Sequence, residues 1–296
     1  MPLITFERAW RAYRRAETRL PVKAPATTPL RVEGVGAIVE RFDLLILDAW
    51  GVLNLGDVPI ARAVTAVGAL RAAGLPLRVL SNDASGEKAR AVANHRRRGY
   101  DFTAAEIVAG LDLLPDTLAR LALPDPIGLI ADPPVPPLPV PMQPLGDDAT
   151  AYDRVSGFVF LSSDGWSEER QALLAASLLR QPRPLVVCNP DIASPGALHL
   201  NAEPGFYAHR LAEKIGIAPI FCGKPEQAIY RRALDGTGVS PERVLCVGDT
   251  LHTDILGARA AGCKAMLVEG GFLAGRDPLS LAAESGIWPD FIAPGL

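Results

Sequence analysis

Short, mostly apolar segments recur along this 296-residue chain. A strand that is apolar at consecutive positions is covered on both faces, as in a parallel sheet. Alternation of such strands with helices predicts an α/β fold, a three-layer sandwich with a mostly parallel sheet and right-handed crossovers. The seven clearest segments are Leu44–Leu47, Leu77–Leu80, Ile127–Ile130, Phe158–Leu161, Leu185–Val187, Val244–Val247 and Ala265–Val268.

Helical patterns fill the intervals between these segments. Ala63, Val67 and Leu70 follow one another at helical spacing, and Gly74 suits the end of that helix. Strand and helix therefore alternate over most of the chain. Further helices are expected after Ser85, Ala104, Ser167, Gly205, Pro225 and Thr253.

The composition is typical of a globular protein, with 49% apolar and 21% charged residues. A net charge of −3 provides no electrostatic footprint for nucleic acid, and no apolar run approaches the ~18 residues of a membrane span. Four widely spaced cysteines without a CxxC pair predict reduced, mostly buried thiols and a cytoplasmic location. The histidines are scattered, so no zinc site is expected.

Two regions depart from the strand–helix rhythm. Residues 1–25 are rich in arginine without a continuous apolar stretch, which indicates an amphipathic first helix rather than a secretory signal. Residues 124–144 are dense in proline and are expected to be a surface connection inside a smaller module. We place that module at 108–205, between core segments 1–107 and 206–296, with 1–40 as an N-terminal extension.

Polar side chains follow three of the predicted core strands. Asp48 directly follows the first strand, and Ser81 and Asn82 follow the second. Asp249 and Asp254 lie around the strand-to-helix turn after the sixth. Each alone is more often a helix cap or turn former, but ligands of open α/β sheets bind beyond the C-terminal strand ends. Hydroxyl and amide donors suit phosphate oxygens, and paired carboxylates suit Mg²⁺.

Four short motifs stand in a characteristic order: DAWGV, SND, GKP and GDTLHTD, with Lys224 in the third. They resemble the four motifs of the haloacid dehalogenase superfamily over residues 41–272. The long interval between Ser81 and Lys224 leaves room for an inserted α/β cap domain, here 108–205. Together with CNPD at Cys188–Asp191, this is similar to the class IIA branch, which includes nitrophenyl-phosphatase-like and sugar- or nucleotide-phosphatase-like proteins.

The resemblance implies a catalytic role for each motif. Asp48 would attack phosphorus and become an aspartyl-phosphate, while Ser81, Asn82 and Lys224 would bind the phosphoryl group. The substrate would be a small phosphorylated metabolite.

The same resemblance implies a Mg²⁺ cofactor, held by Asp48, the backbone carbonyl of Trp50 and Asp249, with Asp254 supporting the site. Asn189 and Asp191 are candidates for substrate contact where cap meets core. A simple turn after Leu185–Val187 is an equal alternative for that pair.

One position departs from the family pattern. Family phosphatases carry DxD, whose second Asp protonates the leaving alkoxide and later activates water, whereas here that position is Trp50. An indole has no usable proton-transfer pKa. The loss of a general acid–base group typically costs ~10²–10⁴ in rate. The Trp50 side chain should border the site.

Three interpretations follow from this departure. The first is a hydrolase whose leaving group needs no proton, or one that uses another acid such as His252. The second is a non-catalytic protein that binds Mg²⁺ and phosphate. The third is a carbon–halogen hydrolase, because DAWG resembles the Asp-x-Tyr-Gly start of 2-haloacid dehalogenases. Those enzymes do not use Mg²⁺ and carry their cap between the first two motifs, so we rank this interpretation last.

Overall fold

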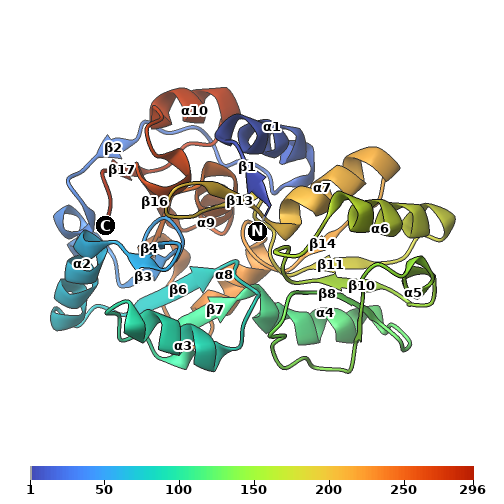
Figure 1. Cartoon of the computed structure of the whole chain (residues 1–296). Helices are drawn as coiled ribbons and strands as arrows, with labels where there is room; N and C mark the ends of the chain where they lie inside the picture. Colours follow the sequence, from blue (N-terminus) through green and yellow to red (C-terminus); the bar gives the residue numbers. More distant parts are fainter. Residues whose placement is uncertain (1) are drawn as a thin grey trace.

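The computed structural model describes residues 2–296 and arranges them in two α/β lobes, each with its own parallel sheet (Figure 1). The larger sheet has seven strands, and every neighbouring pair is parallel. This arrangement confirms the predicted α/β fold with a mostly parallel sheet. The strand order is β2 (Leu30–Arg31), β17 (Phe291–Ala293), β16 (Lys264–Val268), β15 (Val244–Gly248), β3 (Leu44–Leu47), β6 (Leu77–Ser81) and β7 (Ile107–Ala109).

The apolar runs are explained by burial on both faces of this sheet. Successive residues of β3 join different core clusters: Leu45 and Leu47 pack with α2 (Ala61–Ala72), whereas Leu44 and Ile46 pack on the opposite face. That second face is covered by α8 (Gln227–Leu234) and α9 (Leu256–Ala260). The sheet is therefore the middle layer of the predicted sandwich.

The smaller lobe is built on a five-stranded parallel sheet. Its sheet includes β14 (Ile220–Phe221), which lies beyond the predicted module boundary at residue 205. The sequence pattern missed β14 because it is only two half-buried residues long. The strand order is β14 (Ile220–Phe221), β11 (Leu185–Val187), β10 (Phe158–Phe160), β8 (Gly128–Ile130) and β9 (Gln143–Pro144), and its helices are α4 (Leu114–Leu121), α5 (Ala149–Asp153), α6 (Glu168–Arg180) and α7 (Pro204–Ile215).

The N-terminal segment contacts both lobes. Strand β1 (Leu3–Ile4) pairs with β13 (Leu200–Ala202), which pairs in turn with β12 (Ala193–Pro195). The expected first helix is α1 (Phe6–Ala16), which packs against α7 of the smaller lobe. It also lies beside α10 (Pro278–Ser285) of the larger lobe (Figure 1).

The remaining elements are short. A helix α3 (Lys88–Arg97) follows Ser85 as expected, but the helix expected after Ala104 is only a 3-10 turn, Ala104–Glu106. Strands β4 (Asn54–Leu55) and β5 (Val58–Pro59) form a hairpin. All four cysteines are free and buried, as predicted. Across residues 2–296, we find no helix with the length and apolarity that crossing a membrane requires.

Candidate active site

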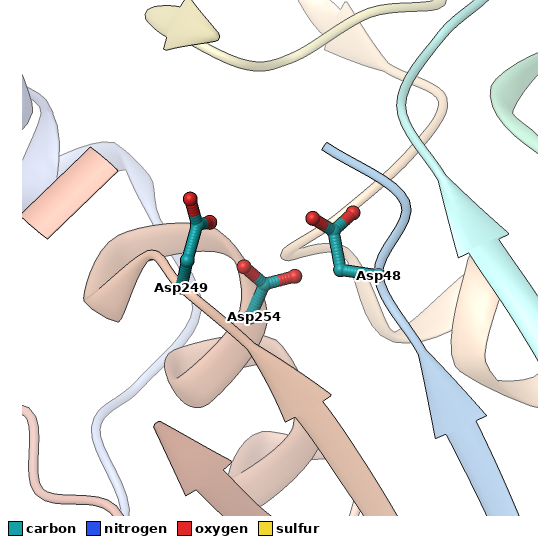
Figure 2. A group of neighbouring side chains, drawn as sticks. All are labelled: Asp48, Asp249 and Asp254. Carbon is teal, nitrogen blue, oxygen red and sulfur yellow. The ribbon is translucent and has the colours of Figure 1, made fainter. Parts of the chain in front are cut away.

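Three carboxylates converge where the central strands of the larger sheet end. Asp48 follows β3 and Asp249 follows β15, and these strands pair in parallel with Leu47 opposite Val247. Asp254 lies on the π-helical turn Leu251–Ile255 that succeeds β15. One oxygen of each lies within 4.8 Å of the others, and the side chains point into a common space (Figure 2).

Backbone and hydroxyl donors orient the two carboxylates near β15. Asp249 accepts hydrogen bonds from the Phe272 N–H at 2.6 Å and from the Thr250 hydroxyl at 2.9 Å. Asp254 accepts one from the Thr250 N–H at 3.1 Å. Gly51 has a φ of +100°, and a Cβ there would lie 1.8 Å from Asp249 Oδ2. The loop after Asp48 therefore approaches Asp249 so closely that only glycine fits at position 51.

Lys224 faces two of these carboxylates. Its side chain is buried, and Nζ lies 2.5 Å from Asp48 Oδ1 and 2.7 Å from Asp254 Oδ1. Burial alone would lower the Lys224 pKa, but Asp254 and Asp48 outweigh it and raise that pKa above its usual value. Lys224 is therefore a fixed positive charge beside Asp48.

Asn82 holds the backbone of Lys224. Its Oδ1 accepts a hydrogen bond from the Lys224 N–H at 2.7 Å. Its Nδ2 donates a hydrogen bond to the Lys224 carbonyl at 3.1 Å. Nδ2 also donates to Asp191 Oδ1 at 2.9 Å. Both amide protons are thus committed, which leaves the Asn82 side chain no further proton to donate to the predicted phosphate. Asn82 positions Lys224 and joins the two lobes.

Ser81 keeps a free donor at the end of β6. Its Oγ accepts from the Asp83 N–H at 3.1 Å, and the side chain borders a cavity of about 250 Å³ that runs along α3. The hydroxyl proton itself has no assigned acceptor among the described residues. Ser81 is therefore available to donate to a ligand oxygen.

The carboxyl groups of the site outnumber its single ammonium group. Burial raises the Asp48 pKa well above its usual value, with Lys224 opposing that shift. Burial and then Asp254 raise the Asp249 pKa to about 7. Three buried carboxylates thus face one ammonium group, and oxygen ligands in this arrangement suit a divalent cation.

Trp50 lies at the edge of the candidate site. Its half-buried side chain lines the cavity beside α3 and also a second cavity of about 60 Å³. The guanidinium carbon of Arg98 lies 5.9 Å from the centre of its ring. No carboxyl occupies the position two residues after Asp48, so the structure retains the departure seen in the sequence.

Residues of the smaller lobe line the second cavity opposite Trp50. Asp191 and Asn189 lie there, and the Asn189 side chain accepts from the Asp191 N–H at 3.1 Å. Sequence reasoning missed a third member, Glu203, which accepts from Asn189 Nδ2 at 3.0 Å and from the Ser194 hydroxyl. Burial raises the Glu203 pKa to about 8. Its only signal in the sequence is an acid before Pro204, which resembles an ordinary helix start.

His252 lies away from the site. Its ring is fully buried, stacks on Tyr13 at a centroid distance of 4.9 Å and bonds Glu17 through Nε2 at 3.0 Å. Burial lowers its pKa, an effect that Glu17 opposes. The structure therefore places His252, for which the sequence predicts a substrate contact or a proton-donor role, outside the lining of both cavities. Its position on the turn after Asp249 directs the side chain toward α1.

Two segments of this chain match models of known protein families. A family model described as haloacid dehalogenase-like hydrolase matches residues 45–129, and another described as HAD-hydrolase-like matches 221–296. These ranges contain Asp48, Ser81, Lys224, Asp249 and Asp254.

Several named phosphatases are similar in sequence. The chain is 27% identical to a D-glycerol 3-phosphate phosphatase from Mycobacterium tuberculosis, over 78% of this chain and 64% of that protein. It is 29% identical to a dihydroxyacetone phosphatase from Corynebacterium glutamicum, over 29% of this chain and 31% of that protein. The chain therefore spans less than two thirds of the length of either relative.

Solved structures match over most of the chain. One is described as a possible sugar phosphatase from Cytophaga hutchinsonii, with 22% identity and a TM-score of 0.78 over 90% of this chain and 98% of that one. Another is a glycerol phosphate phosphatase from Mycobacterium tuberculosis in complex with magnesium, with 25% identity and a TM-score of 0.66. That match covers 86% of this chain and 75% of the other.

Proposed function

The chain belongs to the haloacid dehalogenase-like hydrolases, and from that premise we propose that it is a magnesium-dependent phosphatase. The substrate would be a small phosphorylated metabolite, and the reaction would pass through an aspartyl-phosphate on Asp48. The observation that carries the proposal is the burial of Asp48 in direct contact with Lys224, beside two further carboxylates. A nucleophile, a fixed cation and an acidic group are the parts that phosphoryl transfer needs.

The magnesium assignment rests on the donor set. Asp48, Asp249 and the backbone carbonyl of Trp50 would hold the ion, with Asp254 supporting the site through its contact with Lys224. These are hard oxygen ligands, and the carboxyl groups outnumber the single ammonium group that faces them. When bound, Mg²⁺ would neutralise the charge that develops on the phosphoryl oxygens. A named relative crystallised with magnesium supports this choice.

The chain's own residues would perform the transfer. An Asp48 oxygen would attack phosphorus, and the P–O bond to the leaving group would break. The Lys224 ammonium and the Ser81 hydroxyl would bind equatorial phosphoryl oxygens, and Asn82 would keep Lys224 in place. This division of labour fits a reaction in which positioning and charge neutralisation supply most of the rate enhancement.

A phosphorylation experiment tests the proposal. The wild type, incubated with acetyl phosphate or 4-nitrophenyl phosphate and Mg²⁺, should carry phosphate on Asp48, detected by mass spectrometry after acid quenching. Asp48→Asn should carry none and should lose turnover by a factor of at least ~10⁴. Turnover in Asp48→Asn at the wild-type rate would contradict the proposal.

One observation favours a second candidate, a protein that binds Mg²⁺ and phosphate without turnover. The position of the usual acid carries Trp50, whose indole transfers no proton. Binding of phosphate by the wild type, with no phosphorylated Asp48 and no hydrolysis of aryl, acyl or alkyl phosphates, would support this candidate. A carbon–halogen hydrolase is disfavoured, because the acidic group is intact and the smaller lobe follows β7 rather than β3.

A further inference from the structure

The proposed reaction needs a proton donor that the first motif does not supply. An alkoxide leaving group must receive a proton as the P–O bond breaks. Trp50 occupies the usual position of that acid, and His252 is buried against α1 with no face toward the cavities. For an alkoxide leaving group, the donor therefore has to come from another wall of the site.

Asp191 is a carboxyl of the smaller lobe that is linked to Asp48 through Asn82 and Lys224. It lines the cavity of about 60 Å³ that Trp50 also lines. Its Oδ1 accepts from Asn82, which in turn bonds the backbone of Lys224, and Lys224 contacts Asp48. Among the described residues, no donor bonds Asp191 Oδ2. One oxygen is thus anchored to the catalytic machinery, and the other is available to carry a proton.

We propose that the Asp191 carboxyl is the general acid and base of this enzyme and replaces the carboxyl that is missing at Trp50. The proposal rests on the proposed phosphatase function. It differs from the family pattern because the acid comes from the smaller lobe rather than from the loop that carries the nucleophile.

The proton and electron balance is complete with water as the second substrate. As Asp48 attacks phosphorus, the P–O electron pair moves to the leaving oxygen, and Asp191 transfers its proton to that oxygen to release an alcohol. The Asp191 carboxylate then takes a proton from water as the water oxygen attacks phosphorus. The Asp48–phosphorus bond breaks, inorganic phosphate leaves, and Asp191 is protonated again.

The surroundings of Asp191 suit this exchange. Burial raises its pKa to about 6, against the opposing effects of Lys224 and of the Asn82 hydrogen bond, while Asp254 adds to the rise. The other titratable groups near it are all acids, namely Glu203, Asp83 and Asp164 on the same cavity and Tyr13 on α1. A carboxyl that titrates near neutral pH can both give and take a proton during turnover.

Asp191→Asn is the direct test. Asparagine keeps the size of the side chain and can still accept from Asn82, but it carries no acidic proton. For glycerol phosphate, whose leaving group is an alkoxide, kcat/KM should fall by ~10²–10⁴. For 4-nitrophenyl phosphate, whose leaving group needs no proton, kcat/KM should fall less than about tenfold, because this parameter reports steps up to leaving-group departure.

Two further measurements separate an acid from a positioning residue. In the wild type, the ratio of glycerol phosphate to 4-nitrophenyl phosphate kcat/KM should fall as pH rises above about 6, because the protonated fraction of Asp191 falls. Asp191→Asn should lose this dependence. It should also show a burst of nitrophenolate and accumulate phosphorylated Asp48, because the base for the second step is missing. Asp191→Glu should retain much of the wild-type selectivity.

Glu203→Gln is the matched control. Glu203 lies on the same cavity, and glutamine can accept from Asn189 and donate to Ser194. Its substrate ratio should match the wild type. An equal fall for both substrates in Asp191→Asn, or the same selectivity loss in Glu203→Gln, would overturn the assignment while leaving the phosphatase function standing. Absence of turnover and of phosphorylated Asp48 in the wild type would overturn both.

Discussion

At the scale of single residues, Trp50 separates this chain from phosphatases of the DxD type. The residue borders both cavities, so a carboxyl placed there would face the same space as Asp191. Trp50→Asp should therefore restore an acid when Asp191 has been removed.

We expect Trp50→Asp to raise kcat/KM for glycerol phosphate at least tenfold in the Asp191→Asn background. The reason is that the new carboxyl can protonate the alkoxide. Trp50→Asn in the same background is the control, because it opens the pocket equally without adding an acid. Steady-state kinetics should compare kcat/KM for glycerol phosphate in the two double variants. Equal values would show that pocket size alone causes any gain.

The metal site makes a prediction that does not depend on turnover. Mg²⁺ should raise the melting temperature of the wild type, because a ligand that binds only the folded state stabilises it by RT ln(1 + [L]/Kd), about 2.7 kcal/mol at a hundredfold excess over Kd. Asp249→Asn should lose most of this shift. Equal shifts in the two proteins would contradict the assigned ligands.

Gly51 provides a second test of the proposed metal site. Gly51→Ala should displace Asp249, because a Cβ would lie 1.8 Å from Asp249 Oδ2 and the backbone φ is +100°. We expect a lower melting temperature and a weaker response to Mg²⁺. Gly68→Ala on α2 is the control, since its Cβ would meet nothing within 4 Å. It should stabilise the helix by ~0.5–1 kcal/mol, as measured by urea denaturation.

At the scale of elements, α1 and the turn after it cover the turn that carries Asp254. Glu17 ends this helix and bonds Lys23 and His252. Burial would raise the Glu17 pKa, but these two partners outweigh it and lower the pKa to about 2. A carboxyl with a lowered pKa stabilises the folded state above its unfolded value near 4.5, and that contribution is lost as pH falls through about 2.

Glu17→Gln should therefore be less stable than the wild type at pH 7, by on the order of 1–2 kcal/mol after allowance for solvent screening. The difference should shrink between pH 4.5 and pH 2, because the wild-type carboxyl becomes protonated there. Chemical denaturation across this pH range measures it. A difference that is constant with pH would mean that packing, rather than charge, accounts for the loss.

At the scale of the whole molecule, Tyr13 connects the two lobes. Its ring stacks on His252 of the larger lobe, and its hydroxyl accepts from the Ile192 N–H of the smaller lobe at 3.2 Å. Because α1 contacts both lobes, we expect them to unfold in a single cooperative transition. Calorimetric and van't Hoff enthalpies should then agree.

Tyr13→Phe tests that connection. The substitution keeps the stacking but leaves a buried Ile192 N–H without its acceptor, which costs about 1–3 kcal/mol. The melting temperature should fall while the transition stays single. An unchanged melting temperature would show that the hydrogen bond between α1 and the smaller lobe contributes nothing to stability.

Much of the larger lobe could be predicted from local patterns. The strands β3, β6, β15 and β16 are predominantly apolar because both faces of the sheet are covered, and such runs are visible in the sequence. Strands β2 and β14 were missed because each has two residues and little burial. Their place in a sheet depends on a neighbour rather than on their own pattern.

The sequence by itself determined that Asp48, Ser81 and Asp249 end parallel strands, and strands in register bring such ends together. Only the tertiary structure decided which way Asn82 and His252 point, and that Asp191 reaches Asn82 from 109 positions away. The physical reason is that a strand end follows from a local apolar pattern. The direction of a buried polar side chain follows from the partner that satisfies it, and that partner comes from a distant part of the chain.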